Sequence, residues 1–396
     1  MMPAAMSASA RLLLGGTLAM ALVMGIGRFY FTPMLPLMQQ DYGFDAAVAG
    51  LIASANFAGY LAGSIAASFI RPGRARLWIF RLSVLASVVT TGAMGLTDNT
   101  TAWIVLRTAS GIASALAMIC TAMVVSEALF KVNEAGRVSW IFVGVGAGIA
   151  VSGLLTQFAG GLLTSAQMWY LAAGLCVLLL PFIFAEMRDR DVEARRHVRH
   201  RQIRQPRPLP FAALLVSYTC EGLGYSVFAT FIVAIVKSTP AIAGFADWMW
   251  VTTGVAGAVS ILIWAAVAGR VGYAFALAAG YGLQIIGTAL PAFGDSGAVA
   301  ILAAVLFGGT FMGITMLTLA VGRQSVDGRG IAILTAGFGL GQMVGPYVAG
   351  SVVTRGVSYS DALIGSAAIL LFGLVILMAA IGMRSAGILE GRDPVD

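Results

Sequence analysis

Charged side chains are scarce in this sequence, and their scarcity argues against a soluble fold. Asp, Glu, Lys and Arg make up 10% of the 396 residues, whereas 59% of the residues are apolar. A soluble domain carries roughly 25% charged residues, because its surface faces water. Lipid is therefore the expected solvent for most of these apolar side chains.

Residue types that enzymes and nucleotide-driven proteins need are also scarce or missing. Only two histidines are present, His197 and His200, and both lie in one polar stretch outside the apolar segments. The three cysteines, Cys120, Cys176 and Cys220, lack metal-ligand spacing and are expected to be small buried residues. No Gly-x-x-x-x-Gly-Lys-Ser/Thr loop is present to hold ATP phosphates. We therefore predict no enzyme activity, no metal site and no cofactor.

Long apolar runs dominate the rest of the sequence. A bilayer core about 30 Å thick requires roughly 20 residues of helix. Nearly charge-free segments of that length run at about 12–38, 46–70, 78–97, 102–127, 138–158, 167–185, 210–236, 246–269, 272–292, 297–321, 330–353 and 360–383. A membrane β-barrel would instead show stretches of about ten residues with alternating polarity, which these segments lack. The sequence therefore predicts an all-α integral membrane protein with twelve transmembrane helices.

The basic residues that give the net charge of +7 are unevenly divided between alternate loops. The termini and every second loop hold nearly all the basic residues, including Arg71, Arg74, Arg76, Lys131, Arg137, Arg270, Arg323, Arg329 and Arg384. The opposite loops hold only Lys237 and Arg355, beside several aspartates. This asymmetry is the positive-inside bias of membrane proteins. It predicts that both termini are cytoplasmic, and it explains the basic charge without a nucleic-acid partner.

One polar interval divides the chain into two sets of six spans. It covers residues 186–209 and contains eight arginines and both histidines. We predict an N-terminal half at 1–185, a basic cytoplasmic linker at 186–209 and a C-terminal half at 210–396. The linker is expected to be solvated and held near anionic lipid headgroups. A regulatory or metal-binding role for the histidine pair is the alternative.

The first helices of the two halves share a pattern of glycines. Gly25 and Gly27 lie in the first span, and Gly222 and Gly224 lie at a similar place in the seventh. Six spans followed by six spans, with matching first helices, predict two pseudo-symmetric halves that enclose a central site.

This layout resembles the major facilitator superfamily. Two motifs resemble its bacterial YbfB/YjiJ-type branch, namely Gly25-x-Gly27-Arg28-Phe29-x-x-Thr32-Pro33-x-Leu35-Pro36 and Glu221-Gly222-x-Gly224-Tyr225. Span 4 also carries a motif similar to the superfamily's arginine motif, Arg107-x-x-x-Gly111-x-x-x-Ala115. The resemblance implies a twelve-helix transporter that works by alternating access, for which a monomer is the usual state.

The superfamily's loop signature is incomplete in this chain. The loop after span 2 keeps Arg71-x-Gly73-Arg74 but has Ile70 where the superfamily has an aspartate. The equivalent loop after span 8 keeps only Arg270-x-Gly272. The usual charge lock at the cytoplasmic ends of the helices is therefore not expected here.

Two charged residues near the middle of spans are the main site candidates. A charge within the hydrocarbon costs roughly 2.5–3.5 kcal/mol on insertion scales, so Arg28 in span 1 and Glu221 in span 7 indicate function. We expect Arg28 to bind an anionic group of the substrate, because a guanidinium donates two parallel hydrogen bonds to a carboxylate or sulfonate. We expect Glu221 to take up and release a proton. The structural alternative is a permanent ion pair between Arg28 and Glu221 that joins the halves.

Further candidates are weaker. Arg107 is expected to bind the anion as a second ligand or to form part of a proton path, or else to extend toward the outer interface. Four uncharged polar residues inside spans complete the predicted substrate site: Tyr30, Asn56, Tyr225 and Gln342. Each of these four could instead form only an interhelical hydrogen bond.

These features together predict a secondary active transporter of the bacterial inner membrane. It is expected to move a small organic anion and to be driven by an ion gradient, with protons as the expected ion. The alternative is efflux of drugs or other toxic compounds by proton antiport, in which Glu221 would meet cationic substrates. A non-transporting membrane sensor or scaffold with the same fold is a third possibility.

Overall fold

The computed structural model describes residues 7–70, 73–188, 209–325 and 328–390. Within these residues every regular element is a helix. The elements before the linker are α1 Ala8–Met20, η1 Ala21–Ile26, α2 Phe31–Tyr42, α3 Ala46–Ala67, α4 Arg74–Ala93, η2 Met94–Leu96, α5 Thr100–Lys131, η3 Ala135–Phe142, α6 Val143–Ala159 and α7 Ser165–Glu186. Those after it are α8 Phe211–Ser238, η4 Ala243–Phe245, α9 Ala246–Val271, α10 Tyr273–Ala289, η5 Leu290–Ala292, α11 Gly297–Ser325, α12 Gly328–Thr354 and α13 Tyr359–Glu390.

Twelve stretches of the described helices are long and apolar enough to cross a membrane. This confirms the predicted all-α membrane fold and its number of spans. The division into two halves joined by a linker at 186–209 stays a prediction, because residues 189–208 lie outside the described part of the chain. The signature Arg71-x-Gly73-Arg74 also lies partly outside it.

The first span differs from the expected single helix, because it is broken near its middle. It consists of α1, the π-helical turn η1, a tight turn at residues 27–30, and α2. Hydrogen bonds from Gly27 to Leu22 and from Phe29 to Met24 skip five residues instead of four. Pro33 has no N–H to donate to Phe29, and the Phe29 carbonyl accepts a bond from Thr32 instead. Glycine and proline therefore favour a local break in the helical hydrogen bonds here, while Gly27 and Tyr30 keep right-handed helical backbone angles.

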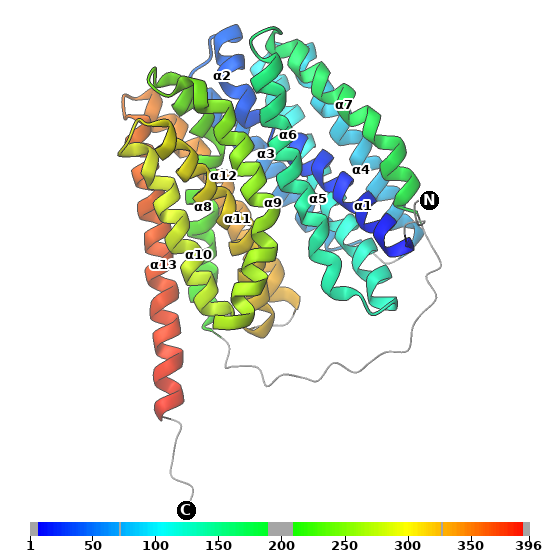
Figure 1. The fold of residues 1–396 in the computed structure, drawn as a ribbon, viewed down its shortest axis with the longest axis vertical. Helices are drawn as coiled ribbons and strands as arrows, with labels where there is room; N and C mark the ends of the chain where they lie inside the picture. Colours follow the sequence, from blue (N-terminus) through cyan, green and yellow to red (C-terminus); the bar gives the residue numbers. More distant parts are fainter. Residues whose placement is uncertain (1–6, 71–72, 189–208, 326–327, 391–396) are drawn as a thin grey trace, which may run out of the picture.

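The spans before and after the linker meet along two pairs of helices. Figure 1 shows the two groups in contact at the end that carries α2, and diverging toward the end where α7 finishes and α8 begins. We call the end that carries α2 the far end. We call the end where α7 finishes and α8 begins the linker end. Helix α3 packs against α12, and α6 packs against α9.

Glycines set how closely these helices approach. A methyl group on Gly254 of α9 would lie 2.2 Å from the backbone nitrogen of Ala150 on α6. A methyl group on Gly350 of α12 would lie 2.2 Å from the carbonyl oxygen of Ala46 on α3. Small residues allow such backbone contact between helices in a membrane. The two halves therefore touch backbone to backbone at both places.

The burial of α8 shows where the halves separate. From Gly224 to Val236 every residue of α8 is buried. In its first eleven residues only the stripe Leu214, Ser217, Tyr218 and Glu221 is buried. A helix buried on all sides lies inside the bundle, whereas a single buried stripe packs on one side only. The bundle is therefore closed around α8 at the far end and looser at the linker end.

Uncharged hydrogen bonds join the halves in the closed region. The Thr32 hydroxyl donates to the Ala229 carbonyl at 2.5 Å. The Trp250 indole donates to the Ser152 hydroxyl at 3.1 Å, and the Ala47 amide donates to Thr354 at 3.0 Å.

The close contact at Gly254 leads to a stability prediction. We expect Gly254→Ala to destabilise the protein by about 1–3 kcal/mol, because the added methyl group overpacks a backbone contact. The apparent melting temperature in detergent measures the change. Gly282→Ala is the matched control, since a methyl group there meets no atom within 4 Å. Equal melting temperatures for both variants and the wild type would contradict the described helix contact.

Candidate substrate site

The break in the first span leaves two backbone carbonyls without helical partners. Side chains of α5 supply the missing donors. The Arg107 guanidinium donates to the Gly27 carbonyl at 3.1 Å and to the Arg28 carbonyl at 2.8 Å. The Ser110 hydroxyl also donates to the Gly27 carbonyl, at 3.0 Å. Arg107 is thus buried against the backbone of the first span and does not extend to the membrane surface.

Arg28 is held at the centre of the bundle by aromatic rings and one amide. Its side chain is 3% exposed. The guanidinium carbon lies 3.7 Å from the centre of the Tyr60 ring and 5.0 Å from that of Phe57. Its Nη2 atom donates to the side-chain oxygen of Gln342 at 3.1 Å. Since Gln342 belongs to α12, this bond links the two halves at mid-membrane depth.

The charge of Arg28 has no carboxylate partner among the described residues. Its Nε and Nη1 atoms are buried and have no hydrogen-bond acceptor there. Arg107 is also buried, at 4% exposure, and it donates its hydrogen bonds to backbone carbonyls. The site therefore holds two positive charges that no carboxylate of the described residues neutralises.

A small cavity separates the two arginines. Arg28 and Arg107 line it together with Asn56, Thr32 and Thr230. Its volume of about 10 Å³ suits a single water molecule. A larger ligand must therefore displace side chains, or bind when the halves are arranged differently.

Glu221 of α8 lies in a separate polar contact, with a residue of α10. It is 1% exposed, and its Oε1 atom accepts a bond from the Gln284 amide of α10 at 2.8 Å. Its Oε2 atom has no hydrogen-bond partner in the described structure. The permanent Arg28–Glu221 ion pair is not present in this conformation, because each of the two residues bonds to a glutamine instead.

Three of the four uncharged candidates lie near Arg28. Gln342 accepts its hydrogen bond, and the Tyr225 hydroxyl lies close enough to interact with its charge. The Asn56 amide donates to the Arg107 carbonyl at 3.0 Å, and its own side-chain oxygen is unpaired.

The fourth, Tyr30, lies elsewhere. Its hydroxyl donates to the Met168 carbonyl at 3.3 Å, and its ring packs edge-on against Trp169. Both partners belong to α7, so the structure does not bring Tyr30 to the cavity between the arginines.

The site also contains residues outside the predicted set. Phe57 and Tyr60 of α3 cover Arg28, Ser110 supports the broken span, and Gln284 contacts Glu221. Ser110 follows Arg107 by three residues and so shares its helix face. This spacing alone could have indicated that Ser110 belongs to the same site as Arg107. In the described residues, no group of three or more His, Cys, Asp or Glu side chains could hold a metal ion.

A family model matches residues 20–378, and its description is "Uncharacterised MFS-type transporter YbfB". The chain belongs to this family. Membership confirms the predicted superfamily, and it identifies the protein as a transporter rather than an enzyme.

Solved transporters share the fold. The nucleoside transporter NupG matches with a TM-score of 0.73 and 15% identity, over 95% of this chain and 99% of that one. The human organic anion transporter MFSD10 (TETRAN) matches with a TM-score of 0.65 and 15% identity, over 94% of this chain and 100% of that one. At such low identity these matches show the fold alone. A search of curated proteins finds no match.

The hydrogen bonds of Arg107 lead to a second prediction. Arg107→Ala should destabilise the protein by about 1–3 kcal/mol, because buried carbonyl oxygens lose their donors. Ser110→Ala should cost less, since Arg107 still donates to Gly27. Melting temperatures in detergent compare the two variants with Arg355→Ala, which removes an exposed arginine. If Arg107→Ala were as stable as the wild type but lost ligand binding, Arg107 would be a ligand residue instead.

Proposed function

We propose that this transporter moves a small organic anion, a carboxylate or a sulfonate, and that it couples this movement to protons. The observation that carries the proposal is the state of Arg28. Its guanidinium is buried at the centre of the bundle, lacks a carboxylate partner in the described residues, and has two nitrogens without acceptors.

Buried charge favours an anionic ligand on energetic grounds. An uncompensated charge in a low-dielectric site is costly, and buried donors without acceptors add about 1–3 kcal/mol each. A carboxylate or sulfonate supplies both the opposite charge and the missing acceptors. Arg107 adds positive potential nearby while its donors stay on the backbone. The proposed substrate site consists of Arg28, Gln342, Asn56 and Tyr225, with Arg107 behind them.

Glu221 is the proposed proton carrier. It is the one buried acid among the described residues, and its Oε2 atom has no hydrogen-bond partner there. Tyr225 follows Glu221 by four residues and so lies on the same face of α8. Tyr225 interacts with Gln342, which bonds to Arg28. Ligand binding at Arg28 therefore has a short route by which to change the surroundings of Glu221.

The orientation follows from the charge distribution. Because the basic residues lie at the linker end, we place this end and both termini on the cytoplasmic side of a bacterial inner membrane. With this orientation, the closed far end faces the periplasm. A monomer contains the whole proposed site.

Drug efflux is the second candidate, and one observation favours it. The Tyr225 ring stacks near Phe307, Phe311 and Phe338, with ring centres 5.7–6.0 Å apart. Such a surface suits flat lipophilic compounds. These rings already contact one another, whereas two nitrogens of Arg28 have no acceptor among the described residues, so we favour the anion.

Ligand-induced stabilisation tests the anion proposal. Small carboxylates and sulfonates are screened against the purified protein, and the right one should raise the melting temperature by mass action. Arg28→Lys should weaken its binding about tenfold or more, because charged hydrogen bonds worth about 1.5–3 kcal/mol are lost. Arg355→Lys, an exposed arginine, is the matched control and should bind normally. Stabilisation only by cations or lipophilic drugs, unchanged in Arg28→Lys, would favour efflux.

Coupling is tested with Glu221→Gln in proteoliposomes. Removing the titratable group should abolish accumulation of the anion in response to a pH gradient, while exchange of labelled for unlabelled substrate continues. Gln284→Ala keeps the acid and removes its partner, and it should retain pH-driven accumulation at a reduced rate. Wild-type accumulation by Glu221→Gln would exclude Glu221 as the proton carrier.

A further inference from the structure

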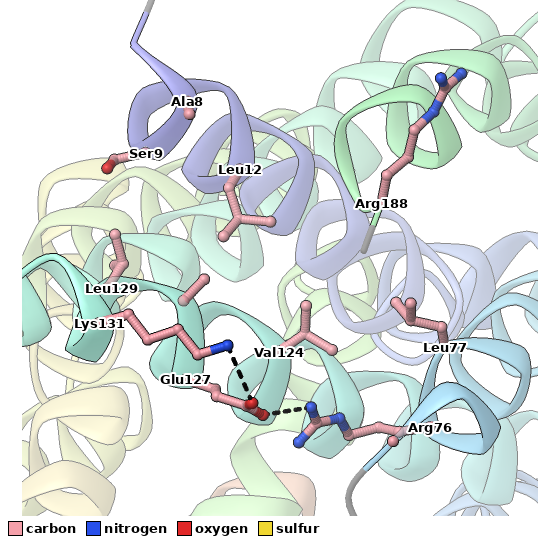
Figure 2. A pocket seen from close by; sticks show the side chains of 12 residues that line it. Ala8, Ser9, Leu12, Arg76, Leu77, Val124, Glu127, Leu129, Lys131 and Arg188 are labelled. Atoms are coloured by element: carbon pink, nitrogen blue, oxygen red, sulfur yellow. Dashed lines mark hydrogen bonds and ion pairs between the residues drawn. The ribbon is translucent and has the colours of Figure 1, made fainter. Parts of the chain in front are cut away.

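A second cavity lies away from the proposed substrate site, at the linker end of the spans before the linker. It has a volume of about 120 Å³ and is lined by the starts of α1 and α4 and the end of α5 (Figure 2). One water molecule needs about 10–15 Å³ of such space, so the cavity accepts a group several times larger. The proposed transport function does not use it.

Basic side chains dominate the charge around this cavity. Arg76 donates to the Glu127 carboxylate at 2.5 Å, and the Lys131 ammonium lies 3.7 Å from the same group. Figure 2 shows both basic side chains reaching Glu127 from α4 and α5, while the Arg188 guanidinium points away from them. Three basic residues and one acid give the lining a net charge of +2.

Neighbouring charges do not cancel this excess. At the same end of the bundle, Arg11 pairs with Glu186, and Arg137 pairs with Glu134. Each of these pairs is neutral as a unit.

Two helix N-termini also lie at the cavity. Helix α4 begins after Gly73, which lines the cavity and gives the helix no side-chain cap. Ala8 and Ser9, in the first turn of α1, form the opposite wall. A helix N-terminus has free N–H groups and a partial positive charge, which favour anions. The Nε atom of Arg76 is buried and has no acceptor in the described structure.

We propose that this cavity binds a phosphate group. A phosphate carries several acceptor oxygens and one or two negative charges, which match the surplus of donors and cations. The remaining lining is apolar and includes Leu12, Leu77, Val124 and Leu129. These residues suit the carbon atoms of a phosphate ester. The phosphate can belong to a phospholipid headgroup at the bilayer surface or to a small soluble compound.

Melting-temperature titrations of the purified full-length protein distinguish the two sources. The probes are dihexanoyl phosphatidylglycerol, dihexanoyl glycerol and inorganic phosphate, with potassium chloride at matched ionic strength. Stabilisation by the phosphatidylglycerol alone identifies a lipid headgroup site. Stabilisation by inorganic phosphate over chloride identifies a site for a soluble phosphate. Stabilisation by neither, or equally by dihexanoyl glycerol, overturns the proposal.

Variants assign the effect to this cavity. Each basic residue near a phosphate contributes about 1 kcal/mol, so Arg76→Gln and Lys131→Gln should each weaken binding about fivefold. Glu127→Gln should strengthen it, because the variant removes the one acid of the lining. If these residues only supported the fold, Glu127→Gln would not bind phosphate more tightly while Arg76→Gln and Lys131→Gln bind it more weakly. Arg270→Gln removes an exposed arginine at the linker end of α9 and should bind like the wild type.

Two comparisons keep the result independent of the transport proposal. Arg28→Ala should retain the full phosphate effect, since the central site is not involved. If Arg76→Gln does not fold, Lys131→Gln and Glu127→Gln still test the cavity. Unchanged affinity in both of these variants would overturn the assignment, whatever the transported substrate is.

Discussion

The need to satisfy backbone polar groups in the absence of water governs the centre of this protein. In lipid, every free carbonyl must find a donor inside the protein. The broken first span exposes the carbonyls of Gly27 and Arg28, and Arg107 supplies donors to both. This contact permits the chain to turn at mid-membrane depth. Because of this turn, the Arg28 side chain lies against α12 of the second half and donates to Gln342 there.

The two buried arginines thereby have different tasks. Arg107 donates its hydrogen bonds to the backbone, whereas Arg28 keeps two nitrogens without acceptors among the described residues. Arg28 is linked to the second half through one neutral amide, that of Gln342. A single such bond is worth about 1–3 kcal/mol. Movement of one half against the other can break it at little cost, which suits a site that must form and dissolve in each cycle.

Hydropathy predicted the spans because each must match the same bilayer thickness, and the rarity of buried charge pointed to Arg28 and Glu221. The break in span 1 was not predicted, although Pro33 and Pro36 indicate it, because the residues of η1 have ordinary helix-forming composition. A π-helical turn shifts the helical phase, so the direction of Tyr30 could not be inferred from its distance to Arg28. The glutamine partners were not predictable as pairs, since they come from helices far apart in sequence.

The closed far end has one more consequence. Among the described residues, the contacts that join the halves there are glycine-mediated backbone contacts and neutral hydrogen bonds. Dissolved ions screen charge–charge attraction but leave shape complementarity and short neutral bonds almost untouched. The closed far end is therefore held by shape complementarity rather than by ion pairs. The barrier to opening the far end should therefore be nearly the same at low and at high ionic strength.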